Sequence, residues 1–287
     1  MRTIFYNTDE NRLRAGWRIL ATTGLAFSLL IVAAVLLRSE WSFNIALAII
    51  VLGVMYVASV AIDKRCFSDF GFAATRRWIK DFLAGNVFAV LSMGFIVLSL
   101  YTTGWLTPIK TELRLFEPEF IKGIISTFVL MAAVSVWEEA YFRSYLITNL
   151  KEGFSFIRPG THSPVIIAVI ISSALFGIAH ITNPNASWIS TFNIAVAGVV
   201  LAYPYVATKS IAIPVGMHLS WNYFQGVVFG LPVSGQALEP SVLQFETSGP
   251  DIITGGSFGP EAGIIGLLSL IFMWSLSYFY IVRFYKK

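Results

Sequence analysis

Charged residues and cysteine are both scarce in this sequence of 287 residues. Only 13% of the residues are Asp, Glu, Lys or Arg, whereas soluble globular domains contain about 25%. Cys66 is the single cysteine, which excludes an internal disulfide and a metal cluster held by several cysteines. The His-Glu-x-x-His motif of soluble zinc proteases is also absent. These absences exclude a disulfide-rich domain and argue against an ordinary soluble enzyme.

Long apolar runs take the place of the missing charges. Hydrophobic residues make up 56% of the chain, and its mean hydropathy is +0.72. A run of about 20 apolar residues is long enough to cross a bilayer as a helix. We therefore expect an all-α, polytopic membrane protein with about eight transmembrane helices, at residues 19–37, 43–62, 82–102, 120–146, 165–181, 189–207, 211–229 and 262–284.

The segments outside these runs suggest a simple domain organisation. Residues 1–18 are polar and basic, which predicts a cytoplasmic N-terminal segment containing a short interfacial helix. Residues 19–287 predict a single integral-membrane domain. The run at 19–37 has spanning length and no clear small-residue cleavage site after it, so we expect a retained signal anchor. Residues 230–261 are rich in Gly, Pro and Ser and predict a long connection before the last helix.

The basic residues predict the orientation of the chain in the membrane. The sequence pI is about 9.2, but Lys and Arg flank the apolar runs instead of forming a patch, so no nucleic-acid partner is expected. If the N-terminus lies inside, all but four of the 20 Lys and Arg residues fall on cytoplasmic segments; the exceptions are Arg38, Lys110, Arg114 and Lys122. This bias predicts eight helices in the cell membrane with both termini cytoplasmic.

The fourth apolar run contains two adjacent carboxylates, Glu138 and Glu139, followed by Arg143. Charged groups in hydrocarbon are costly, so such residues normally face the interior of a bundle and carry function. In an α-helix, Glu139 and Arg143 share one face and can pair, whereas Glu138 points about 100° away. The pattern predicts one anchored glutamate and one available for chemistry. The alternative is a purely structural ion pair that ties two helices together.

Two of the three histidines also lie in apolar runs. His180 lies near the end of the fifth run, and His218 lies in the seventh with Asn222 four residues later on the same helix face. A single histidine in such a run is often a hydrogen-bonded contact between helices. Three helices that each offer polar groups can supply a base, a second imidazole and hydrogen-bond donors. Those are the groups needed to activate water and to stabilise an oxyanion.

The three patterns together resemble a known family. Glu138-Glu139-x-x-x-Arg143, Phe176-x-x-x-His180 and His218-x-x-x-Asn222 occur in this order in the fourth, fifth and seventh runs. In these contexts they are similar to the CAAX protease and bacteriocin-processing (CPBP) family of intramembrane endopeptidases, and to its bacterial and archaeal type II CAAX prenyl endopeptidases. The resemblance covers mainly residues 120–230. It implies a protease core there, with a catalytic cavity formed by helices four to seven.

The resemblance also implies roles for the site residues. Glu138 and His180 are expected to activate the attacking water, while His218 and Asn222 stabilise the oxyanion. Glu139 and Arg143 are expected to support the site structurally. Whether a metal takes part is left open: Glu138, His180 and His218 could ligate Zn²⁺, but direct activation of water by Glu and His is favoured.

The leading hypothesis is an intramembrane endopeptidase that cuts a peptide or membrane-protein substrate near the cytoplasmic side of the bilayer. One alternative is a proton-coupled transporter that uses Glu138 and the histidines as a relay, although the repeated halves of many transporters are absent. Another is a non-catalytic immunity or partner protein in the membrane. An activity assay on purified protein separates these functions.

The depth of the candidate residues imposes one geometric condition. Glu138 lies about 27 Å along the fourth run from its outer end, and His180 lies near the outer end of the fifth. The two side chains meet only if the fifth helix begins well inside the cytosol, or if the helices tilt around a deep aqueous cavity. We expect the helix to begin near His162.

Overall fold

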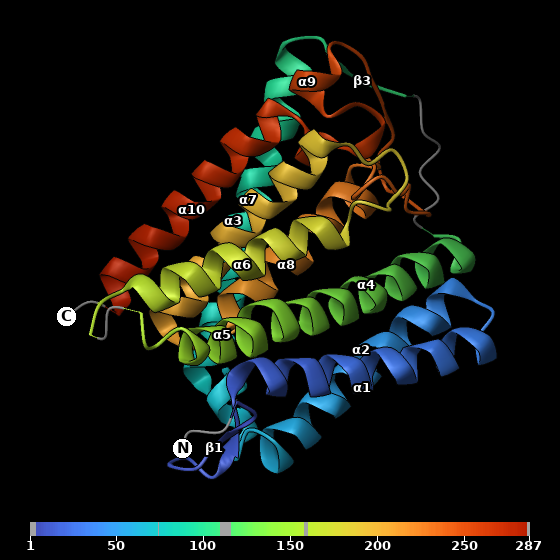
Figure 1. Ribbon diagram of the computed structural model, residues 1–287. Coiled ribbons are helices and arrows are strands. Elements are labelled where there is room, and N and C mark those ends of the chain that lie inside the picture. The colour runs from blue at the N-terminus through green and yellow to red at the C-terminus, as the bar shows by residue number, and fades with distance from the viewer. Residues whose placement is uncertain (1–3, 74, 110–115, 158–159, 286–287) are drawn as a thin grey trace.

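The computed structural model describes residues 4–73, 75–109, 116–157 and 160–285, and these form a helical bundle (Figure 1). The longer helices are α1 (Ala15–Leu36), α2 (Glu40–Ala61), α3 (Arg76–Thr102), α4 (Pro118–Glu138), α5 (Ile147–Gly153), α6 (Ser163–Ala179), α7 (Trp188–Thr208), α8 (Ala212–Tyr223) and α10 (Ile264–Phe284). A π-helix, η2 (Glu139–Leu146), joins α4 to α5 without a break, and a second, η3 (Phe224–Val228), extends α8.

Short elements occupy the connections. The strands β1 (Tyr6–Asn7) and β2 (Arg12–Leu13) form an antiparallel pair, as do β3 (Leu106–Pro108) and β4 (Phe245–Thr247). The remaining pieces are η1 (Phe67–Phe70), α9 (Asp251–Thr254), η4 (Gly256–Phe258) and η5 (Pro260–Ala262). The segment after α8, predicted as a long connection, thus folds into several short turns of structure that pack on the bundle.

The predicted fold class, an all-α polytopic membrane protein, is confirmed. Within the described residues, six helices are long and apolar enough to cross a membrane. Large apolar side chains such as Phe27 and Val35 are 64% and 78% exposed, as expected of surfaces that face lipid. The count of eight is not confirmed, because α6 has only 17 residues and α8 only 12 before its π-helical extension.

Helix α8 is short because protein, not lipid, surrounds it. Residues 211–221 are all buried, and α8 packs closely against α3, α4 and α7. Glycines allow this close approach: a Cβ atom at Gly216 would collide with the backbone carbonyl of Phe82, and one at Gly85 with that of Ile213. Small residues at such crossings are typical of helix packing in membranes. The crossing places α8 in the centre of the bundle.

The chain alternates between two ends of the bundle. Both chain ends and the connections after α2, α5 and α7 lie at one end, which we call the terminal end (Figure 1). The connections after α1, α3, α6 and α8 lie at the other, which we call the distal end. Helix α4 lies between the α1–α2 hairpin and α8.

The predicted interfacial helix in residues 1–18 is wrong for the part that the structure describes. Residues 6–13 form the β1–β2 hairpin instead, and α1 begins at Ala15. The turn is rich in Asn and Asp: Asn7 accepts a hydrogen bond from the Asp9 amide at 3.2 Å, and Asn11 adopts a left-handed conformation with φ of 53°. These residues favour turns over helix because their side chains bond to the local backbone.

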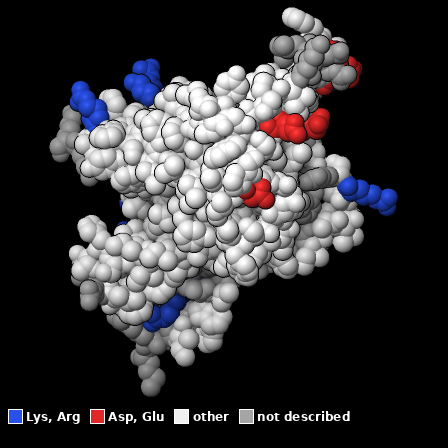
Figure 2. Space-filling model, turned by 90° about the horizontal axis from the view of Figure 1, so that it is seen from above, with Lys and Arg blue, Asp and Glu red and all other residues white. Residues whose placement is uncertain are grey.

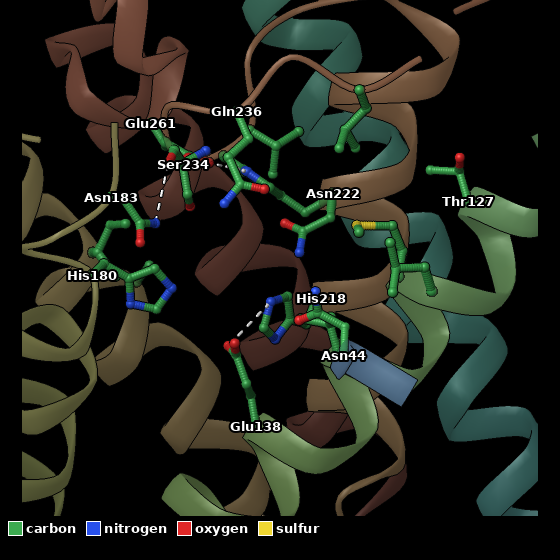
Figure 3. A pocket seen from close by; sticks show the side chains of 18 of the residues that line it. Asn44, Thr127, Glu138, His180, Asn183, His218, Asn222, Ser234, Gln236 and Glu261 are labelled. Atoms are coloured by element: carbon green, nitrogen blue, oxygen red, sulfur yellow. Dashed lines mark hydrogen bonds and ion pairs between the residues drawn. The ribbon is translucent and has the colours of Figure 1, made fainter. Parts of the chain in front are cut away.

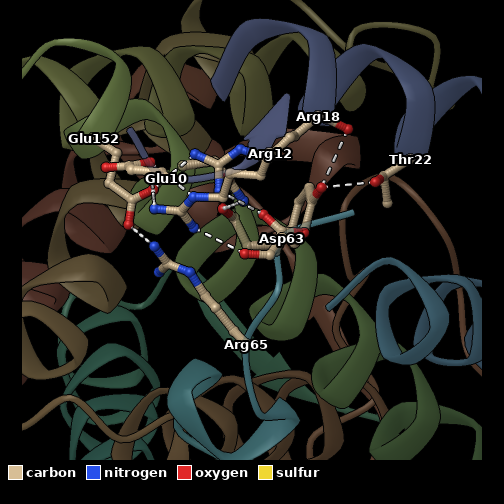
Figure 4. Close-up of polar contacts among 9 residues, drawn as sticks. Glu10, Arg12, Arg18, Thr22, Asp63, Arg65 and Glu152 are labelled. Atoms are coloured by element: carbon tan, nitrogen blue, oxygen red, sulfur yellow. Dashed lines mark hydrogen bonds and ion pairs between the residues drawn. The ribbon is translucent and has the colours of Figure 1, made fainter. Parts of the chain in front are cut away.

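Five charged side chains from segments distant in sequence meet at the terminal end (Figure 4). Arg18 of α1 pairs with Asp63 at 2.9 Å and with Glu152 of α5 at 2.7 Å. Arg12 lies 3.4 Å from Glu152, which also pairs with Arg65. The orientation argument counted Arg18 and Arg143 among the Lys and Arg residues of cytoplasmic segments. In the structure both are buried ion-pair partners, at 2% and 1% exposure.

Candidate active site

The junction of α4 with the π-helix η2 places both adjacent glutamates toward α8, with Glu138 as the last residue of α4 and Glu139 as the first of η2. A π-helix closes i→i+5 hydrogen bonds, so each residue turns the chain by less than the 100° of an α-helix, and neighbouring side chains diverge less. Accordingly, His218 contacts both carboxylates: Nδ1 lies 2.9 Å from Oε1 of Glu139, and Nε2 lies 3.8 Å from Oε2 of Glu138. The sequence analysis assumed an α-helix here, in which the two glutamates point about 100° apart. The contact of both with His218 was therefore not expected.

Glu139 is held from two sides. Besides His218, it pairs with Arg143, whose Nε atom lies 3.1 Å from Oε2 of Glu139. The Arg143 guanidinium also stacks on Phe176 of α6, with Cζ 3.8 Å from the ring centre. Glu138 differs, since the contact of its Oε2 atom with His218 is longer, at 3.8 Å, and its side chain lines the cavity described below. The pairing expected between Glu139 and Arg143 is therefore present, and Glu138 is the less constrained carboxylate.

The hydrogen bonds of the two histidines indicate which ring nitrogen carries a proton. Nδ1 of His180 lies 2.8 Å from the carbonyl oxygen of Phe176. A carbonyl oxygen only accepts, so this assigns the proton to Nδ1 and leaves Nε2 as the other functional atom. By the same reasoning, the Glu139 carboxylate accepts from Nδ1 of His218. In both rings, therefore, Nε2 is the atom left for chemistry.

These side chains open into one cavity of about 700 Å³ (Figure 3), a size within the usual range for ligand pockets. Glu138, His180, His218 and Asn222 all line it, and Figure 3 shows them directed toward a common space. The helix that carries His180 begins at Ser163, with His162 at its N-cap, as expected from the depth argument. Contributions come from α4, α6, α7 and α8, and also from α2, α10 and the connection after α8.

The sequence analysis missed the polar groups that the connection after α8 adds to this cavity. Glu261 is buried there and accepts hydrogen bonds from the Ser234 amide and, at 3.3 Å, from Nε1 of Trp221 in α8. Asn183, after α6, donates to the Ser234 carbonyl oxygen at 3.1 Å. Gln236 also lines the cavity (Figure 3). The only sequence signal was the Gly-rich composition of the segment, which does not identify individual partners.

The candidate metal ligands do not form a ready metal site. Among the described residues, no group of three or more His, Cys, Asp or Glu side chains is arranged to hold a metal ion. Glu138 and His218 approach each other, with 3.8 Å between Oε2 and Nε2, but His180 does not join them in such a group. The arrangement thus does not fit a three-ligand Zn²⁺ centre formed by Glu138, His180 and His218.

The fold and the cavity define a class: a helical membrane protein whose interior cavity combines carboxylates, imidazoles and amides. Residues 120–224 match the family model described as type II CAAX prenyl endopeptidase Rce1-like. This segment extends from α4 into η3 and includes all six predicted site residues, so the family resemblance inferred from the three motifs is confirmed. No match was found among curated proteins or among solved structures.

Proposed function

We propose that this protein is an intramembrane endopeptidase that hydrolyses a peptide bond in its interior cavity. The observation that carries the proposal is the buried Oε2 atom of Glu138, which has no hydrogen-bond partner in the described chain and lies at a cavity that His180 and His218 also line. A buried carboxylate oxygen without a partner is costly, so its retention suits a group that acts on a bound molecule. The family match of residues 120–224 supports the same reaction.

In the proposed reaction, Glu138 and His180 bind one water molecule between them. Glu138, assisted by Nε2 of His180, removes a proton as the water oxygen attacks the carbonyl carbon of the substrate. The same groups then return the proton to the leaving amine. Glu139 and Arg143 act as positioning residues, because they fix the ring of His218 and the π-helix η2, which directly follows Glu138.

His218 and Asn222 are proposed to stabilise the negative oxygen that forms during the attack. Asn222 offers its amide N–H groups to the cavity, and His218 donates from Nε2 when both of its ring nitrogens carry protons. Glu139 then accepts from Nδ1 and holds the ring in place. Donors fixed before the reaction are effective because they need no reorganisation when the charge develops.

The variant Glu138→Gln tests the proposal. Gln keeps the shape of the side chain but cannot accept a proton from water at neutral pH, so cleavage of a peptide library should fall by ~10²–10⁴ while thermal stability is kept. The control is Glu239→Gln, which changes an exposed carboxylate of the same cavity and should retain cleavage. Retained cleavage by Glu138→Gln would refute the assignment and favour the transporter alternative.

The same cleavage assay tests whether a metal ion takes part in the reaction. Direct activation of water predicts that thorough chelation leaves cleavage unchanged, whereas a zinc enzyme would lose activity and regain it with Zn²⁺.

His218→Ala and Asn222→Ala should each slow the chemical step by about 10²–10³, because each removes one proposed donor. The measurement is single-turnover cleavage at saturating peptide. A change confined to substrate affinity would contradict the oxyanion role of that residue.

A further inference from the structure

The connection after α8 makes a tight turn on the wall of the cavity (Figure 3). Val233 and Gln236 pair through both of their backbone groups, with N···O distances of 2.8 and 2.9 Å. Between them, the Ser234 amide donates to the Glu261 carboxylate, and the Ser234 carbonyl oxygen accepts from Asn183 at 3.1 Å. The backbone of this turn is therefore held from several sides.

The chain that follows the turn has free hydrogen-bonding groups. Among the described residues, the backbone N–H and C=O groups of Ala237 and Leu238 have no hydrogen-bond partner, and neither does the carboxamide of Gln236. All three residues line the cavity, and Gln236 and Ala237 are exposed. Pairing resumes at Val242, whose amide donates to the Val227 carbonyl oxygen at 2.7 Å. A stretch of unpaired backbone is thus anchored on both sides and lies along the cavity.

A peptide that enters this cavity brings polar backbone groups into largely apolar surroundings. Figure 2 shows a face of the molecule on which charged side chains are few. The cavity lining itself includes apolar side chains such as Leu130, Met131, Leu270 and Met273. Backbone N–H and C=O groups are costly to leave unpaired in such surroundings. The free groups after the turn supply the partners that an incoming peptide lacks.

We propose that Gln236–Leu238 form a binding edge for the main chain of an extended peptide substrate. Free backbone groups along an edge are where extended peptides add as a further strand. The backbone of Ala237 and Leu238 pairs with the peptide, and the Gln236 carboxamide, which offers a donor and an acceptor side by side, pairs with an adjacent peptide group. The inference rests on the proposed protease function. The edge lies outside the matched residues 120–224 but lines the same cavity as Glu138.

This edge implies a broad substrate class. Hydrogen bonds to the main chain are independent of the side chains of the peptide, so they provide affinity for an extended segment of many sequences. The fixed turn means that the edge needs little reorganisation when the peptide binds. Glu261 and Asn183 act here as positioning residues, because they hold the turn from which the edge begins.

Direct binding tests the edge without relying on cleavage. The variant Glu138→Gln is titrated in detergent with a library of fluorescein-labelled peptides, and the tightest binder becomes the probe. Adding Gln236→Ala should weaken binding of this probe about tenfold, as expected for lost hydrogen bonds. Ala237→Pro removes one backbone donor and should also weaken binding. The matched control is Gln244→Ala, an exposed glutamine of the same connection that does not line the cavity.

An ester scan of the probe tests the pairing itself and remains decisive if Ala237→Pro fails to fold. Replacing one peptide N–H by an ester oxygen removes a single donor and nearly keeps the shape of the peptide. At one position this should weaken binding to Glu138→Gln about tenfold, and Gln236→Ala should abolish that difference. Equal losses with and without Gln236 would overturn the proposal. So would the absence of saturable binding by every peptide in the library.

Cleavage by the chain that retains Glu138 separates this inference from the proposed function. Gln236→Ala should raise KM about tenfold and change kcat by less than about twofold, because the edge holds the substrate equally before and during the reaction. A loss confined to kcat would overturn the binding role of Gln236. If the native chain cleaves no peptide but binding still depends on Gln236, the protease function is refuted and the binding edge stands.

Discussion

Arg143 is the residue on which the local order of the site depends most. Its guanidinium is 1% exposed, pairs with Glu139 and stacks on Phe176, so it joins η2 to α6. A planar guanidinium can pair and stack at the same time, which an ammonium group cannot do. The two neighbouring glutamates consequently differ in freedom: Glu139 is held by Arg143 and His218, and Glu138 is left facing the cavity.

We predict that Arg143→Ala lowers both the stability and the accumulation of the protein. The change leaves the Glu139 carboxylate buried without its cation, which costs roughly 3–5 kcal/mol where burial is deep. Thermal melting in detergent measures the effect. Arg143→Lys should be intermediate because it keeps the charge and loses the stacking, and the exposed Lys151→Ala should melt like the parent. An unchanged melting temperature for Arg143→Ala would show that the pair does not stabilise the fold.

At the scale of elements, the segment between η3 and α10 completes the cavity. Its residues supply part of the exposed lining of the cavity, and Glu261 connects the segment to α8 through Trp221. The backbone amide of Ser234 donates to the same carboxylate. Asn193 of α7 also donates to the backbone of this segment, at 3.1 Å from the Glu261 carbonyl oxygen. Glu261 is thus one of several polar groups that hold this connection to the bundle, together with Asn183 and the pairing of β3 with β4.

The variant Glu261→Ala should therefore loosen this segment. It leaves Nε1–H of Trp221 buried and the half-buried Ser234 amide both without an acceptor, at about 1–3 kcal/mol for a fully buried group. We expect faster limited proteolysis between η3 and α10 and weaker peptide binding, with the helices still assembled. Glu246→Ala is the matched control, because Glu246 is exposed in the same segment. Equal proteolysis of the two variants would contradict the anchoring role of Glu261.

For the whole molecule, ion pairs at the terminal end connect the α1–α2 hairpin to α5. Arg18 is 2% exposed and Asp63 is fully buried, and Arg18 also reaches Glu152 at the end of α5. Nearby, the Arg12 guanidinium holds the pKa of the Glu10 carboxyl below its ordinary value. None of these side chains lines the cavity, so this cluster contributes to assembly and not to the proposed chemistry.

We expect Arg18→Ala to destabilise the bundle by roughly 3–5 kcal/mol, since Asp63 then remains buried and unpaired. The fraction that folds should keep normal cleavage per molecule, unlike Arg143→Ala. Melting and specific activity of the purified variant are the two measurements. Arg18→Leu/Asp63→Leu should recover part of the stability because it removes both charges. Arg76→Ala, a change at an exposed position, is the control. If Arg18→Ala has the same melting temperature as this control, the stabilising role of the cluster is refuted.

Sequence alone was sufficient for features that depend on neighbouring residues. Apolar runs located the long helices, since the hydropathy of a run and its length decide whether it can cross a bilayer. Two bounds were wrong, because α3 begins at Arg76 and not at 82, and the fourth helical stretch continues through η2 and α5 to Gly153. The pairing of Glu139 with Arg143 was also predictable, because i and i+4 side chains meet on any helical turn. The candidate residues of α4, α6 and α8 were selected from their polar character in apolar surroundings, and they do line one cavity.

Only the tertiary structure decided which of these groups touch. The contacts of His218 with Glu138 and Glu139 join α8 to the junction of α4 and η2. They depend on a π-helix that no sequence pattern predicted. The burial of α8, the anchoring of the last connection by Glu261, and the Arg18–Asp63–Glu152 cluster likewise join segments far apart in sequence. Such contacts follow from how helices pack against one another, and packing depends on the shapes of all the facing surfaces together.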